Sequence, residues 1–169
     1  MDGRPAASGL TVGERFTRRA SFDAGSIRSF ATLCGDHNPL HHDERAAAAS
    51  RFGTLIASGP HVVALMMGLD ASFLSRDADA LGLGFEFRFV KAVPAGTELT
   101  LEWTITGIEY KASLDGDVVS VEGRAVDDAG IAYVTATGRN LVRSSASRSA
   151  SQSALQSVSQ SALPPLPDP

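Results

Sequence analysis

The second half of the chain alternates apolar and polar residues with a period of two. This pattern is typical of strands that bury one face. The clearest runs are residues 85–89, 99–105, 118–126 and 131–142. Turn-forming residues separate the later runs at Asp115-Gly116 and at 127–130, and an earlier run over residues 11–22 reads as a first strand. We therefore expect an antiparallel sheet.

A different period governs the stretch from Gly59 to about Leu74. Its apolar residues recur at helical spacing and occupy much of the circumference, and they are Val62, Val63, Leu65, Met66, Met67, Leu69 and Phe73. A helix of this length would extend roughly 24 Å. So broad an apolar surface predicts a helix that a sheet covers on most sides. The expected fold class is α+β, with a long central helix wrapped by an antiparallel sheet.

Two shorter helices are expected before this central one. Asp23 can cap the first, whose apolar stripe is Ile27, Phe30, Ala31 and Cys34. We read Cys34 as a small core residue, and Gly35 ends the helix. Asp43 can open the second helix, which continues through the alanine run 46–49.

The two short helices are joined by an irregular turn, GDHNPLHH, at residues 35–42. Pro39 has no N–H and a fixed φ, so His37 and His41 cannot be a helical i, i+4 pair. Asp36 and His41 instead lie on either side of a bend, and Asn38 favours such a turn. A carboxylate and an imidazole held in a rigid bend beside an apolar helix have the geometry that general acid–base catalysis requires.

Composition narrows the class of protein. The chain has 169 residues, 43% of them hydrophobic, which favours one domain with a substantial core. The net charge is −4, and no basic patch alternates with aromatic residues, so nucleic acid is not an expected partner. One cysteine excludes an internal disulfide, and no apolar run approaches the roughly 18 residues of a spanning helix. We expect a cytoplasmic protein without a membrane segment.

The two ends of the chain differ in composition from the middle. Residues 1–9 read as a flexible arm, and 10–143 as the folded domain. Residues 144–169 are rich in serine, glutamine and, at the end, proline, and they contain an approximate SQSAL repeat. Such a segment buries too little apolar surface to offset its ordering entropy. We expect a disordered tail.

Three segments together resemble a known family. GDHNPLHHD, then LIASGPHVVALMM, then FEFRFVKAVPAGTELTLEW are similar to the MaoC-like dehydratases, which include the (R)-specific enoyl-CoA hydratases. The resemblance extends over residues 10–142. It implies the hot-dog fold, in which an antiparallel sheet wraps a long helix, in agreement with the periodicities above.

The resemblance also implies a reaction and a site. Asp36 and His41 would be the catalytic pair of a hydratase that adds water across the 2,3 bond of an acyl-CoA thioester. The N–H of Gly59 would bind the thioester oxygen, Asn38 would fix the bend, and Ser58 would support the site where family members often carry histidine. A homodimer is implied, and no cofactor is expected.

Other interpretations of these residues remain open. Asp36 could simply cap a turn, and His41 could be a surface histidine. The cluster of His37, His41, His42 and Asp43 imitates a metal site, but Pro39 removes the helical spacing of a zinc motif, so no metal is expected. We interpret His61 as a structural residue on the helix face. The alternative functions are a hot-dog acyl-CoA thioesterase and a non-catalytic acyl-CoA-binding subunit.

Overall fold

A computed structural model describes residues 9–144 of the chain. Five antiparallel strands form one sheet in the order β1-β3-β4-β5-β2. The strands are β1 (Arg15–Phe22), β2 (Ala78–Phe89), β3 (Thr97–Lys111), β4 (Gly116–Val126) and β5 (Ala132–Ser144). The expected antiparallel sheet is therefore confirmed, and β1 and β2 are its edge strands.

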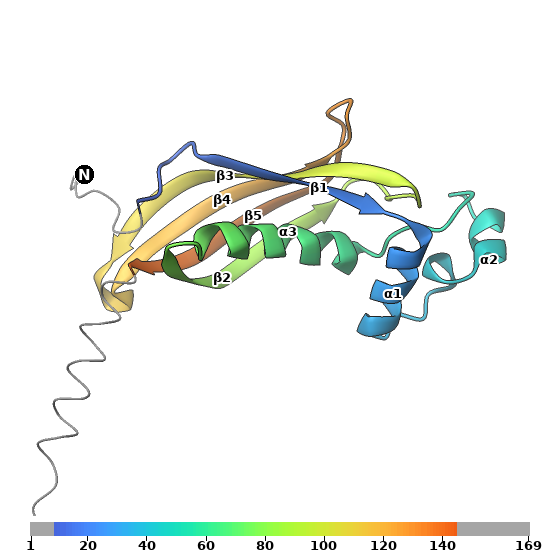
Figure 1. The fold of residues 1–169 in the computed structure, drawn as a ribbon, viewed down its shortest axis with the longest axis horizontal. Coiled ribbons are helices and arrows are strands. Elements are labelled where there is room, and N and C mark those ends of the chain that lie inside the picture. Colours follow the sequence, from blue (N-terminus) through green and yellow to red (C-terminus); the bar gives the residue numbers. More distant parts are fainter. Residues whose placement is uncertain (1–8, 145–169) are drawn as a thin grey trace, which may run out of the picture.

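The central helix α3 (Gly59–Leu74) has the expected bounds and lies along one face of the curved sheet (Figure 1). The helices α1 (Ala24–Cys34) and α2 (Glu44–Ala49) lie at one end of the molecule, near the start of α3 (Figure 1). A short 3-10 turn, η1 (Pro39–His41), lies between them in the chain, and a second, η2 (Ala112–Leu114), joins β3 to β4. The helices that carry the predicted bend thus gather where α3 begins.

Trp103 connects the sheet to the central helix. Its ring is completely buried, and its Nε1–H donates to the Met66 carbonyl of α3 over 2.9 Å. A Cβ on Gly123 of β4 would lie 2.4 Å from this ring, so only glycine lets the indole lie flat against the sheet. The contact ties the buried face of β3 to the central helix.

Several local predictions differ from the structure. Residues 11–13 form a turn in which Gly13 has φ +90°, so β1 begins four residues later than expected. β2 begins at Ala78 rather than near residue 85, because backbone pairing with β5 orders an Ala/Gly/Leu segment that has no alternation. Cys34 is exposed rather than part of the core, since the buried face of α1 is formed by Ile27 and Ala31.

The covering of α3 is also less complete than predicted. Val62, Met66 and Leu69 are buried, but Met67 is 39% exposed. One side of the helix therefore remains open although it is apolar.

The expected arm and tail lie almost entirely outside the described residues. At the C-terminal boundary of the folded domain, β5 extends to Ser144, one residue beyond the expected end at residue 143. Within residues 9–144, no helix is both long and apolar enough to cross a membrane.

Candidate functional site

The structure brings Asp36 and His41 together at the start of α3. His41 Nε2 lies 3.4 Å from Asp36 Oδ2. The imidazole side chain is 7% exposed, whereas the carboxylate side chain is 34% exposed. A nearly buried imidazole therefore faces a carboxylate that solvent or a small molecule can reach. Their role in catalysis stays a prediction.

Local backbone geometry places the carboxylate. Gly35 ends α1 in the left-handed conformation, with φ +70°, and turns the chain out of the helix. The Asp36 N–H then donates to the Ala31 carbonyl over 2.9 Å, and Asp36 Oδ1 accepts the Asn38 N–H over 3.0 Å. Asp36 is thus fixed through both its backbone and its side chain.

Asn38 and Pro39 form the rest of the bend as turn chemistry predicts. The Asn38 side chain accepts the Leu40 N–H over 3.1 Å and caps η1, in which Pro39 occupies the first turn. The His41 N–H donates to the Asn38 carbonyl over 3.0 Å. Asn38 therefore organises the backbone that carries His41.

One hydrogen bond fixes the orientation of the His41 ring. Its Nδ1 lies 2.8 Å from the carbonyl oxygen of Ile56, and because a carbonyl can only accept, Nδ1 carries the hydrogen. The second nitrogen, Nε2, is left to face Asp36. Proton exchange by this imidazole must therefore run through Nε2, at the atom nearest the carboxylate.

The same residue, Ile56, joins the bend to the start of the central helix. The Ile56 N–H donates to the Leu40 carbonyl over 3.1 Å, so Ile56 is bonded to both Leu40 and His41. Gly59, three residues later, is the first residue of α3. The bend and the helix N-terminus are consequently held in one rigid unit.

Gly59 is placed to offer an N–H, as the first N–H groups of a helix lack intrahelical partners. A Cβ on Gly59 would lie 2.7 Å from the Phe89 ring, so close packing is a second reason for glycine here. Ser58 is buried at the N-cap position, but its side chain makes no capping hydrogen bond. Its supporting role stays a prediction.

An open groove of about 450 Å³ runs beside Gly59. Its lining is mainly apolar and includes Val62, Phe89 and Val93, with Arg51 and Lys91 as its cationic members. Such a groove could hold an apolar ligand whose polar end reaches the helix N-terminus.

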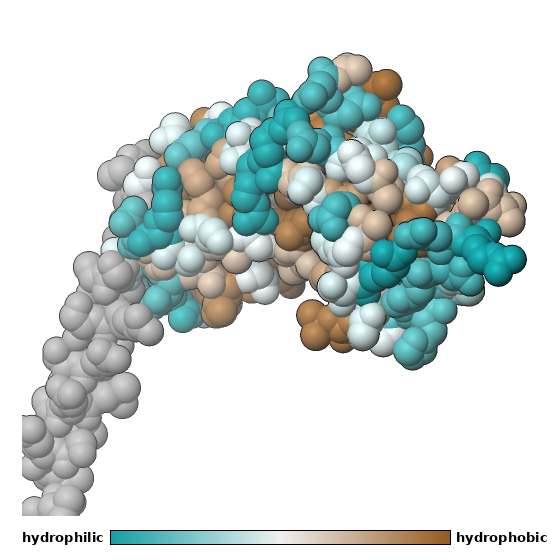
Figure 2. All heavy atoms as spheres, turned by 45° about the vertical axis from the view of Figure 1, so that its right-hand side comes forward, coloured by the Kyte–Doolittle hydropathy of each residue, from teal (hydrophilic) through white to brown (hydrophobic). Residues whose placement is uncertain are grey.

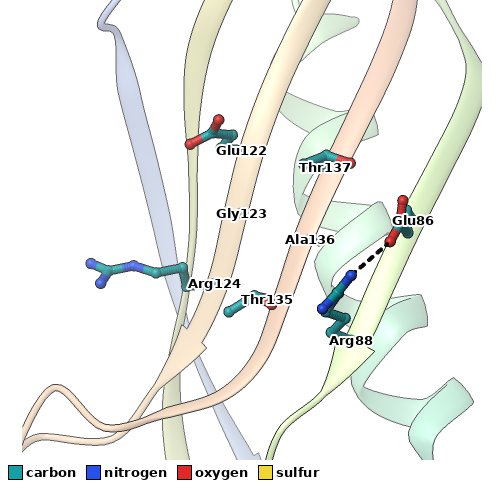
Figure 3. Close-up of a pocket in the computed structure, with 8 residues that line it drawn as sticks. All are labelled: Glu86, Arg88, Glu122, Gly123, Arg124, Thr135, Ala136 and Thr137. Carbon is teal, nitrogen blue, oxygen red and sulfur yellow. Dashed lines mark ion pairs between the residues drawn. The ribbon is translucent and has the colours of Figure 1, made fainter.

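A second depression, of about 390 Å³, lies on the sheet itself (Figure 3). Its lining includes Glu86, Arg88, Glu122 and Arg124, and α3 lies on the far side of the strands in this view. The Glu86–Arg88 ion pair within it spans 3.8 Å, and both side chains are highly exposed. This polar surface contains no part of the Asp36–His41 pair.

Two polar side chains of α3, His61 and Asp70, are also buried, but they have fewer or longer hydrogen bonds than His41. The His61 ring stacks on Phe30 at 4.5 Å and meets the edge of Phe22, and its Nδ1 has no hydrogen-bond partner among the described residues. Burial lowers the pKa of His61 and so favours the neutral form of the ring. The structural interpretation of His61 agrees with these contacts.

The second buried side chain is Asp70. Burial raises the pKa of its carboxyl to about 6. Its Oδ1 accepts a long hydrogen bond of 3.4 Å from Asn140 Nδ2. Sequence reasoning missed this buried carboxyl. The signal was present, because Asp70 follows Val62 and Met66 at intervals of four and so falls on their buried face.

Sequence reasoning also missed the carbonyl of Ile56 and the part that His42 plays in the bend. His42 Nε2 lies 2.6 Å from the backbone oxygen of Asp36. Neither contact has a signal in the sequence pattern, since both depend on how the bend folds back on itself. Among the described residues, no group of three or more His, Cys, Asp or Glu side chains is placed to hold a metal ion.

The chain is similar in sequence to several known proteins. A UPF0336 protein of Streptomyces avermitilis is 32% identical over 144 residues, which cover 79% of this chain and 93% of that protein. An (R)-specific enoyl-CoA hydratase of Aeromonas caviae is 29% identical over 130 residues, covering 72% of this chain and 96% of the hydratase.

Solved structures extend the likeness to three dimensions. The crystal structure of the MaoC-like dehydratase from Rhodospirillum rubrum matches with a TM-score of 0.69 and 31% identity, covering 80% of this chain and 94% of the dehydratase. The hot-dog fold is thereby confirmed. A family model described as MaoC like domain matches residues 10–127. The chain belongs to the MaoC-like domain family.

Proposed function

We propose that this protein is a hydro-lyase that adds or removes water across the 2,3 bond of an acyl thioester. Its reaction would interconvert a 2-enoyl-CoA and an (R)-3-hydroxyacyl-CoA. The observation that carries the proposal is the facing pair of His41 Nε2 and Asp36 Oδ2, 3.4 Å apart beside the N-terminus of α3. The named hydratase relative supports the same reaction class.

The pair can move both protons that hydration needs. In this proposal Asp36 and His41 hold one transferable proton between them and bind one water. The oxygen of that water bonds to the β-carbon while one of its protons passes to the pair, and the pair gives a proton to the α-carbon. The pair ends with the proton count it began with. Each well-placed acid or base contributes roughly 10²–10⁴-fold to the rate.

Charge also develops on the thioester oxygen, because attack at the β-carbon turns the thioester into an enolate. The Gly59 N–H and the positive end of α3 would stabilise that charge. The groove beside Gly59, lined by Val62, Phe89 and Val93, would take the adjoining part of the substrate. No cofactor or metal takes part in this scheme.

The test is a panel of 2-enoyl-CoA thioesters from short to medium chain, assayed with wild-type protein. Loss of the enoyl absorbance without release of free thiol is expected. Release of free CoA would identify a thioesterase instead, and binding without turnover would identify a non-catalytic subunit. Asp36→Asn protein is the control, since it should bind the same thioesters and fail to hydrate them.

We further propose that the protein forms a homodimer through the open side of α3 and the edge strand β2. β2 is paired on one side, by β5, and Leu81, Leu83 and Phe89 on it are 61%, 49% and 59% exposed. Met67 of α3 adds exposed apolar surface, and brown apolar residues reach the surface on the lower side of the molecule (Figure 2).

A second copy of the chain would cover both features at once. A 12-residue edge strand presents its outer backbone edge as a template for pairing, and pairing two copies through the same edge gives a closed two-fold dimer. Light scattering at micromolar concentration should report twice the chain mass. An active protein that stays monomeric there would contradict the proposal.

A further inference from the structure

His42 follows His41 in the chain, but its ring contacts the start of the bend at Asp36, whereas the His41 Nδ1 contacts Ile56. Its Nε2 lies 2.6 Å from the backbone oxygen of Asp36. Since that carbonyl can only accept, Nε2 carries the hydrogen, whereas in His41 it is Nδ1 that donates to Ile56. Two adjacent histidines therefore hold two different backbone carbonyls.

The His42 bond closes the bend across its base. It joins residue 42 to residue 36, the residue that carries the carboxylate. The peptide that follows Asp36 would otherwise be held by turn contacts, chiefly the acceptance of the Asn38 N–H by Asp36 Oδ1. A bond to the carbonyl oxygen restricts rotation of this peptide and so limits where the carboxylate can lie.

His42 is itself held in place by α1. Arg28 Nε donates to the His42 carbonyl over 3.2 Å, and the Arg28 guanidinium pairs with Glu44 at the start of α2. The same helix accepts the Asp36 N–H through the Ala31 carbonyl over 2.9 Å. Helix α1 thus fixes Asp36 directly and also fixes the histidine that bonds to Asp36.

We propose that His42 is a positioning residue for the reaction. It holds the Asp36 carboxylate in the position where it faces His41 Nε2. The proposal rests on the proposed hydro-lyase function of that pair. His42 acts through the Asp36 backbone and the ring is half-buried, so its loss should lower kcat and leave KM nearly unchanged.

The experiment compares His42→Leu, which removes the donor, with His42→Gln, whose amide nitrogen can replace Nε2. His37→Gln is the matched control, because His37 is an exposed histidine of the same bend. We expect His42→Leu to lose about 10-fold or more in kcat, since misplacement by 1 Å can cost about 10²-fold. His42→Gln should recover most of that loss, and His37→Gln should match the wild type.

Folded His42→Leu protein with wild-type kcat would overturn the proposal, and so would a His42→Gln variant as slow as His42→Leu. If wild-type protein hydrates no thioester, the hydro-lyase function fails instead. In that case the nitrogen chemical shifts of the His41 imidazole decide the positioning role. They should change in His42→Leu and not in His37→Gln, and unchanged shifts in both would overturn it.

Discussion

The bend at residues 36–42 buries His41 and the inner face of α3 buries His61 and Asp70, but the partners of these polar side chains differ. In the bend, each ring nitrogen of His41 faces a polar atom, Ile56 O or Asp36 Oδ2. On the buried face of α3, no residue within 9–144 partners the Nδ1 of His61, and Asp70 accepts a long hydrogen bond from Asn140. Burial alone therefore does not single out a functional site, and the partners directed at both nitrogens of His41 are what favour the bend as the candidate site.

The largest expected effect concerns the pair in the bend. Asp36→Asn and His41→Ala should each lower kcat by at least about 10²-fold, because each removes a proton carrier. The double variant should be little slower than the worse single one, since residues that act as a unit are strongly non-additive. Steady-state hydration assays on protein shown to be folded would measure this.

Stability gives the control for that prediction. Unfolding by denaturant should show little loss, or a gain, because charged catalytic groups are kept at some cost to the fold. A folded single variant that hydrates like the wild type would return both residues to a structural role.

On the buried face of α3, Asp70 should have the largest effect on the free energy of unfolding. Its pKa in the folded protein, about 6, lies above the unfolded value near 3.8, so the folded state binds the proton more tightly. Stability should therefore fall as the pH rises from about 4 to 6 and then level off. Asp70→Asn should remove this fall and stabilise the protein at pH 7 by roughly 2 kcal/mol.

The measurement is denaturant unfolding of wild type and Asp70→Asn at pH 4 and pH 7. The two proteins should differ more at pH 7 than at pH 4. An equal difference at both values would show that the Asp70 carboxyl is not desolvated in solution. Hydration activity should be unchanged, because Asp70 lies near the opposite end of α3 from Gly59.

Gly59 belongs to both regions. It is the first residue of α3, next to the candidate site, and it packs against the Phe89 ring. Gly59→Ala should lower kcat by about 10-fold, because the added Cβ meets the Phe89 ring and shifts the helix N-terminus by a small distance. Phe89→Leu in the same protein should relieve the contact and recover part of the rate. If the double variant is no faster than Gly59→Ala, steric pressure from Phe89 is not the cause.

The smallest expected effect is at His61. Phenylalanine fits the same stack against Phe30 and has no unpartnered nitrogen, so His61→Phe should raise stability at neutral pH by about 1 kcal/mol. Burial lowers the folded pKa of His61, so the unfolded state binds the proton more tightly. Wild-type stability should fall as the pH drops below about 6.5, and the variant should lack this component.

That pH dependence opposes the one expected for Asp70, so the two variants can be told apart by thermal unfolding across pH 4 to 7. A His61→Phe protein with lower hydration activity would instead assign His61 to the site.

The parts of the fold that depend on periodicity could be predicted from the sequence. The bounds of α3 follow from its apolar spacing, and the placing of Asp36 and His41 on either side of a turn follows from Gly35 and Pro39. The first half of β2 could not be predicted, because its residues gain order from pairing with β5. The tautomers of His41 and His42 could not be predicted from the sequence either, because each depends on a backbone carbonyl that folding brings next to the ring.

The bonds from Ile56 to Leu40 and His41 have a consequence for how this domain can diversify. They clamp the chain on both sides of residues 44–54, which form α2 and the loop after it. Apart from Ala47, which is buried, and Glu44, which pairs with Arg28, the residues of this segment are exposed or half-buried, so changes in its length or sequence should disturb the clamp little. Arg51 and Phe52 of that segment line the groove. Grafting loops between the clamp points would therefore reshape the groove while leaving the Asp36–His41 pair unchanged.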